Sequence, residues 1–146
     1  MTEVNPIEIV PNFKHIERET WDAIKDRLPN SCFTKNRSRF LSLFKDRVPL
    51  EEGTKAFSLF KGANEVPMHA TDFCYPHYQE AYFYYLFGAI EMDCYGLIDM
   101  ITGVPMLFVQ RTNNLDKIWM TVMSAEDFAT KYEMEVHYLD ELPAYL

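Results

Sequence analysis

The sequence predicts an α/β (α+β) domain in which a mixed β-sheet is flanked by helices. Three short apolar segments, residues 82–87, 95–100 and 106–109, contain many aromatic or aliphatic residues and are separated by turn residues, which is typical of strands. Segments 82–87 and 106–109 are apolar on both pleat faces. Helices should therefore cover at least one side of the sheet, and this pattern favours cover on both sides.

Composition limits the classes of partner and compartment. A chain of 146 residues has the length of about one domain. The net charge is −8 and the 14 Lys and Arg residues are scattered, so we expect no nucleic-acid partner. The odd set Cys32, Cys74 and Cys94 has no C-x-x-C spacing, which argues against a disulfide framework and favours a cytoplasmic location. The first thirty residues have no long apolar run, so we expect neither a signal peptide nor a membrane span.

Two amphipathic helices should precede the sheet. Residues 1–11 are either a disordered lead or an extended strap, and the sequence leaves this open. From Asn12, apolar residues at helical spacing predict a helix that stops at Pro29, with Trp21 interpreted as a core residue. After a break at residues 31–36, residues 37–48 predict a second helix, and residues 56–60 predict a strand.

Residues 63–79 form a long loop with a spacing that invites a metal hypothesis. The pattern H-x2-D-x-C-x2-H comprises His69, Asp72, Cys74 and His77. The ligand types are mixed, and prolines at positions 67 and 76 break any helix that could align them. We therefore expect these residues to be ordinary loop residues and the chain to hold no metal.

The final third of the chain predicts a loop, a capped helix and a short strand. Trp119 lies among methionines in residues 115–123. Ser124 and Asp127 have the spacing of a capping box, which predicts a helix running to about Tyr132. Residues 136–139 predict a strand and residues 140–146 a helical turn. The sequence has no Gly-rich phosphate loop, nucleophile elbow or assembled catalytic set.

A longer set of residues resembles the amino-terminal domain of prolidase, the Xaa-Pro dipeptidase related to aminopeptidase P and creatinase. The resemblance covers residues 36–146. It rests on Asn36, Arg37, Arg39, Gly62, Glu65, Thr71, Asp72, Gln79, Glu80, Phe87, Gly88, Glu91, Cys94, Tyr95, Gly96, Ile98, Asp99, Thr102, Gly103, Leu107, Phe108, Val109, Arg111, Trp119, Met120, Ser124, Glu126, Phe128, Lys131, Tyr132, Val136, Tyr138, Asp140 and Glu141.

This resemblance implies a creatinase/prolidase amino-terminal domain at residues 35–146, preceded by an extension of residues 1–34 with one helix. In the family such a domain is fused to a catalytic domain, expected to be absent from this chain, that binds two divalent metals, usually manganese. The ligands there are two Asp, one His and two Glu. The amino-terminal domain provides dimer contacts and walls off the active-site mouth, and Trp119 matches a tryptophan that projects toward the partner subunit's active site.

The expected function is thus a non-catalytic accessory domain of a manganese Xaa-Pro peptidase, whose partners are the catalytic domain, a second subunit and, in the full enzyme, Xaa-Pro peptides. The family often has an aromatic-Arg-Gln triplet at this point, but this sequence has His77-Tyr78-Gln79. Any contact that the family arginine makes is therefore not expected here. Two alternatives remain open. One is a stand-alone protein-binding module that uses the loop at 63–79, and the other is an independent enzyme that uses His69, Asp72 and His77.

Overall fold

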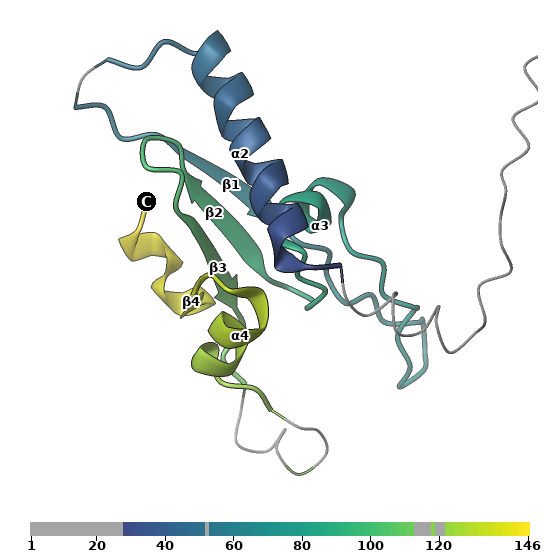
Figure 1. Ribbon diagram of the computed structural model, residues 1–146. Helices are drawn as coiled ribbons and strands as arrows, with labels where there is room; N and C mark the ends of the chain where they lie inside the picture. The colour runs from purple at the N-terminus through teal and green to yellow at the C-terminus, as the bar shows by residue number, and fades with distance from the viewer. Residues whose placement is uncertain (1–27, 52, 113–117, 119–121) are drawn as a thin grey trace, which may run out of the picture.

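The computed structural model describes residues 28–51, 53–112, 118 and 122–146, and it contains a four-stranded sheet with helices on both faces (Figure 1). The elements in chain order are α2 (Asn30–Arg47), β1 (Phe57–Lys61), α3 (Ala81–Phe87), β2 (Tyr95–Asp99), β3 (Pro105–Val109), α4 (Ala125–Tyr132), β4 (Glu135–Tyr138) and the 3-10 helix η2 (Leu139–Ala144).

The strands lie in the sheet in chain order, β1-β2-β3-β4. β2 is antiparallel to both β1 and β3, and β4 is parallel to β3. The turn between β2 and β3 is closed by Asp99, whose Oδ1 accepts hydrogen bonds from the amides of Ile101 (2.8 Å) and Thr102 (3.2 Å). Among the described strands, β1 and β4 therefore form the two edges.

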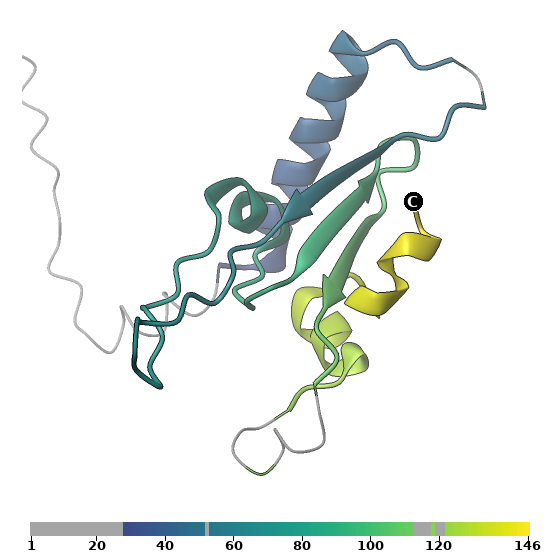
Figure 2. The ribbon, with the colours of Figure 1, turned by 180° about the vertical axis from the view of Figure 1, so that it is seen from behind.

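The two faces of the sheet are covered unequally. The larger core lies between the sheet and helices α2, α3 and α4, whereas η2 packs on the opposite face (Figures 1 and 2). Alternation along β3 divides its side chains between these cores, with Leu107 and Val109 on the helical side and Met106 and Phe108 toward η2. The predicted mixed sheet with flanking helices is confirmed, and among the described elements the second face carries the short η2 alone.

The prediction of a strand at residues 82–87 is wrong, because this segment is helix α3. The Glu80 carboxylate accepts a 2.7 Å hydrogen bond from the amide of Phe83 and caps the helix start. Gly88 ends the helix in a left-handed conformation (φ 67°) and donates to the carbonyl of Tyr84. Phe83, Leu86 and Phe87 are buried at spacings of three and four residues. A helix this short shows only two turns of that pattern, so its aromatic content resembled a strand.

The second predicted helix begins earlier than expected. The break predicted at residues 31–36 is wrong, because α2 runs from Asn30 to Arg47. Pro29 has the fixed φ (−61°) and extended ψ of a residue that precedes a helix. Phe33 and Arg37 are buried four residues apart and extend the inward face of α2 to its first turn.

The other described elements match their predictions to within one residue at most boundaries. Predicted strands 56–60, 95–100, 106–109 and 136–139 correspond to β1, β2, β3 and β4. The helix predicted from residue 12, with Trp21, lies outside the described residues, as does most of segment 115–123. No helix in the described part of the chain is long and apolar enough to span a membrane.

Candidate functional site

Trp119, the residue that the sequence singles out, belongs to the segment between β3 and α4. Trp119 itself lies outside the described residues, so its role stays a prediction. Both anchors of the segment are described: Arg111 follows β3, and Ser124 precedes α4. Arg111 and Ser124 therefore bound the Trp119 segment on either side.

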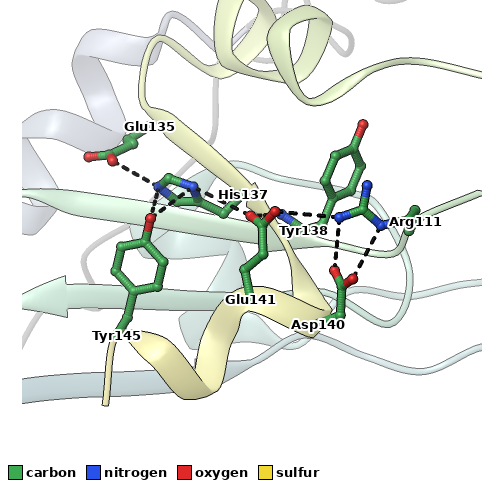
Figure 3. Close-up of polar contacts among 7 residues, drawn as sticks. All are labelled: Arg111, Glu135, His137, Tyr138, Asp140, Glu141 and Tyr145. Carbon is green, nitrogen blue, oxygen red and sulfur yellow. Dashed lines mark hydrogen bonds and ion pairs between the residues drawn. The ribbon is translucent and has the colours of Figure 1, made fainter.

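Arg111 is held by β4 and η2 on the carboxyl side of β3. Its guanidinium lies 3.8 Å from the centroid of the Tyr138 ring. Nε and Nη2 each donate to the Asp140 carboxylate at 3.3 Å, and Nη2 also lies 3.4 Å from Glu141 Oε1 (Figure 3). The hydrogen bond with Asp140 raises the pKa of Arg111. The planar guanidinium thus pairs with a carboxylate and stacks on an aromatic ring, two contacts that a lysine would not reproduce together.

Ser124 begins α4 with the predicted capping box. Its amide donates to Asp127 Oδ2 at 2.8 Å, and its hydroxyl accepts from the Asp127 amide at 3.2 Å. Two of the amides that lack partners at the helix start are thereby satisfied. This prediction is confirmed, and the carboxyl end of the Trp119 segment is anchored to a well-formed helix.

His137 forms a second polar group beside Arg111, on the face of β4 that meets η2. Its Nε2 lies 2.8 Å from Glu135 Oε1, and the Tyr145 hydroxyl lies 3.1 and 3.2 Å from the two ring nitrogens. Glu141 Oε2 is 3.8 Å from Nδ1 (Figure 3). The imidazole also packs on Phe108, with centroids 5.6 Å apart. Tyr145, Glu135 and Glu141 therefore all contact the imidazole of His137. These contacts hold η2 against β3 and β4.

Sequence reasoning missed His137. Glu135 and His137 are two residues apart in a strand, so their side chains lie on the same face. This spacing is a weak signal that the two side chains are neighbours. Tyr145 is eight residues away in sequence and reaches the ring only because η2 folds back over the sheet. No spacing in the sequence predicts that return.

The loop residues of the metal hypothesis are mostly exposed. His69, Asp72 and Cys74 are exposed, while His77 is half-buried and its Nε2 has no hydrogen-bond partner among the described residues. His77 lines a cavity of about 280 Å³ together with Ala63, Asn64, Glu65, Val66, Tyr75, Pro76 and Tyr78. A hydrogen bond with Glu65 raises the pKa of Cys74, which disfavours the thiolate that binds metals. Nowhere in the described ranges do three or more His, Cys, Asp or Glu side chains form a group that could hold a metal.

Comparison with known families identifies this fold. Residues 33–146 match the family described as "Aminopeptidase P, N-terminal domain". The chain belongs to this family. Its described residues do not fit the pair of metal ions expected for the catalytic part of such enzymes, because the required cluster of carboxylates and histidine is not found among them.

Relatives of this aminopeptidase P N-terminal domain include Xaa-Pro dipeptidases. The chain is 33% identical over 122 residues to the Xaa-Pro dipeptidase of Rattus norvegicus and 32% identical to that of Homo sapiens, covering 82% of this chain and 24% of each relative. A probable Xaa-Pro aminopeptidase of Verticillium alfalfae is 37% identical over 73 residues, which are 49% of this chain and 16% of the relative. The chain thus spans about a quarter of the length of the dipeptidases that it matches.

Solved structures share the fold of the domain. The low-pH form of aminopeptidase P from E. coli has a TM-score of 0.63 at 18% identity, covering 81% of this chain and 26% of that chain. Proline aminopeptidase P II from Yersinia pestis has a TM-score of 0.62 at 20% identity, covering 80% and 26%. At these identities the likeness concerns the fold.

Several residues that carry the family resemblance have structural roles in this aminopeptidase P N-terminal domain. Gln79 joins three segments: its Oε1 accepts from the amide of Ala63 at 2.6 Å, and its Nε2 donates to the carbonyl of Glu91 at 2.9 Å. The Glu91 carboxylate pairs with Lys131 at 2.8 Å and accepts from the Tyr132 hydroxyl. The loop before β2 is thereby tied to the end of α4, a link between segments about forty residues apart.

Proposed function

We propose that this chain acts as the non-catalytic, amino-terminal accessory domain of an Xaa-Pro dipeptidase-like manganese metallopeptidase. The observation that carries the proposal is the family match over residues 33–146, together with 33% identity to an Xaa-Pro dipeptidase over 122 residues. In this proposal the manganese ions and the hydrolysis of Xaa-Pro peptides belong to a catalytic domain, and residues 35–146 form the accessory unit. A cytoplasmic location is part of the proposal and rests on the three free cysteines.

The proposed first task of the domain is to shape the active-site mouth of a partner subunit through Trp119. Support comes from the way the ends of its segment are held. Arg111 is bound by Asp140 and stacked on Tyr138, and Ser124 is fixed in a capping box. A gating side chain needs a segment whose two ends are held, because a shift of the segment would withdraw the side chain from the substrate.

The proposed second task is dimerisation. η2 lies against β3 and β4, and on the same face Leu59 of β1 is 44% exposed. β1 is also an edge of the sheet among the described strands. Unpaired edges and uncovered apolar faces recruit other chains, which supports a contact with a second subunit here.

The alternative function, a stand-alone protein-binding module, is favoured by one observation. Aromatic side chains are exposed in and just beyond the loop at 63–79: Phe73 is 74% exposed, Tyr78 83% and Tyr82 73%. Aromatic residues are enriched at protein interfaces, so this surface fits a protein partner.

The reading frame beyond the codon for Leu146 separates the two functions. The accessory-domain proposal expects it to continue into a domain with two Asp, one His and two Glu as metal ligands. A natural stop codon directly after Leu146 would instead favour the binding module.

A domain exchange tests the accessory role directly. Residues 33–146 are inserted in place of the matching region of the human Xaa-Pro dipeptidase. We expect the exchanged enzyme to dimerise and to hydrolyse Xaa-Pro dipeptides with manganese, and the double substitution Phe73→Ser and Tyr78→Ser to leave its activity unchanged. A folded, metal-loaded dimer without activity would contradict the accessory role.

A further inference from the structure

A groove of about 620 Å³ lies where α2, α3 and α4 converge. Its wall includes Phe33 of α2 and Tyr84 of α3, whose rings meet edge to face at 5.6 Å. Gly88 lets Phe33 approach closely, since a Cβ on Gly88 would lie 2.3 Å from the Phe33 ring. Tyr132 at the end of α4 completes the lining. Three aromatic side chains, those of Phe33, Tyr84 and Tyr132, therefore form part of the groove lining.

The rim of the groove includes exposed apolar side chains. Ile90 is 56% exposed and Leu28 is 50% exposed, and both line the groove. Lys131 and Glu133 provide the polar part of the rim, and Lys131 is paired with Glu91 at 2.8 Å. An aromatic wall beside exposed aliphatic side chains and a polar rim fits the apolar face of an amphipathic helix.

The chain itself enters the described structure at this groove. Leu28 and Pro29 line it, and Pro29 is extended (φ −61°, ψ 139°) before α2 begins. The Asn30 side-chain amide donates to the Lys131 carbonyl at 3.1 Å, which fixes the first residue of α2 to the end of α4. Residues that precede Leu28 are therefore tethered at the rim of the groove.

We propose that residues 12–27 dock in this groove of their own chain as an amphipathic helix, with Trp21 and Ile24 against its apolar wall. The sequence places Phe13, Ile16, Trp21, Ile24 and Leu28 mostly on one side of a helical wheel. Ile24 is four residues from Leu28 and so lies within about 14 Å of the rim even in an extended chain. Trp21 lies six residues before position 27, about 9 Å along the axis of such a helix.

The tether favours this segment over a separate partner. A ligand joined to the rim by a few residues experiences a high effective concentration and a small loop-closure cost. A second copy of the chain or a different protein would have to compete with it from solution. Docking would also remove Ile90 and Leu28 from water at once, which adds a hydrophobic gain.

Fluorescence of Trp21 tests the proposal in the full chain. Trp119→Phe leaves Trp21 as the single tryptophan. We expect acrylamide to quench Trp21 several-fold less in this protein than in a peptide of residues 12–28. Ile90→Glu should raise quenching toward the peptide value. Val66→Glu is the matched control, because Val66 has a similar exposure (54%) but lines a different cavity, and it should leave quenching unchanged.

Other results would overturn the proposal. Equal quenching in the protein and the peptide would show an undocked segment. Equal effects of Ile90→Glu and Val66→Glu would show that the groove is not involved. Protection that disappears on dilution would assign the groove to a second copy. If circular dichroism shows that Ile90→Glu is unfolded, Ile24→Glu gives the same readout from the segment side, and unchanged quenching in that variant would count against docking.

Discussion

Arg37 of α2 donates a 2.7 Å hydrogen bond from Nη1 to the carbonyl oxygen of Leu86 near the end of α3. Its Nη2 donates to the Thr34 hydroxyl at 3.1 Å. Arg37 is only 8% exposed, and burial lowers its pKa. The last carbonyls of a helix lack partners within the helix, and a cation is favourable there. This contact joins the two helices that cover one end of the sheet.

Replacement of Arg37 should therefore destabilise the fold. Arg37→Ala leaves the buried Leu86 carbonyl without its donor, at a cost of about 1–3 kcal/mol in the free energy of unfolding. Urea denaturation measures the change. Arg39→Ala is the control, because Arg39 is exposed two residues along the same helix and should change stability by about 0.5 kcal/mol or less. Equal losses in the two variants would contradict the role assigned to the Leu86 contact.

Gly96 of β2 should tolerate no side chain. A Cβ at this position would lie 2.3 Å from Cε2 of Phe87, whose ring packs directly on the strand. Gly96→Ala should cost about 1–3 kcal/mol through overpacking. The reason can be checked by measuring Gly96→Ala again in a Phe87→Leu background. If the Phe87 ring causes the clash, Gly96→Ala should cost less stability in the Phe87→Leu background than in the parent protein. Equal costs in the two backgrounds would mean that the clash does not come from the ring.

Asp127 should make α4 sensitive to acid. The backbone hydrogen bond from Ser124 lowers the pKa of Asp127 below its ordinary value. A carboxyl whose pKa is lowered in the folded state stabilises the protein above its unfolded pKa of about 3.9, and this contribution is lost as pH falls through the lower folded pKa. Asp127→Asn should therefore weaken the dependence of stability on pH in this acidic range.

Thermal unfolding at a series of acidic pH values measures the effect of Asp127→Asn. Ser124→Ala serves as the comparison, because it removes the hydroxyl but keeps the amide that bonds Asp127. It should lower stability while retaining most of the pH dependence. An unchanged pH profile in Asp127→Asn would show that the capping carboxylate is not the acid-sensitive group.

Trp119 provides the test of the gating proposal. Trp119→Ala should leave the melting temperature of this chain within a few degrees, since the gating proposal places the side chain outside the core, where its removal costs about 0.5 kcal/mol or less. In the enzyme with the exchanged domain it should lower kcat/KM about 5- to 150-fold, equivalent to roughly 1–3 kcal/mol of transition-state binding. A core tryptophan would cost about 3–5 kcal/mol instead. The gating proposal would therefore be refuted if Trp119→Ala unfolds the isolated chain while the enzyme with the exchanged domain keeps its activity.

Local sequence patterns determine some elements of this fold and leave others ambiguous. β2, β3 and the Ser124–Asp127 capping box were predicted because each depends on neighbours within a few residues of the chain. α3 was mistaken for a strand because seven residues with six large apolar side chains satisfy either periodicity. The αL conformation of Gly88 and the side chain of Glu80 decide for the helix, and both act at its ends rather than in the apolar run.

The sequence by itself determined the layered fold class, the family resemblance over residues 36–146 and the capped start of α4, since these follow from local patterning and from runs of matching residues. Tertiary structure alone decided the parallel placement of β4 beside β3, the return of Tyr145 to His137, and the contact of Arg37 with Leu86. The physical reason is one of distance along the chain. Hydrogen bonds between residues 49 positions apart, such as Arg37 and Leu86, depend on how whole elements pack, and no local periodicity encodes them.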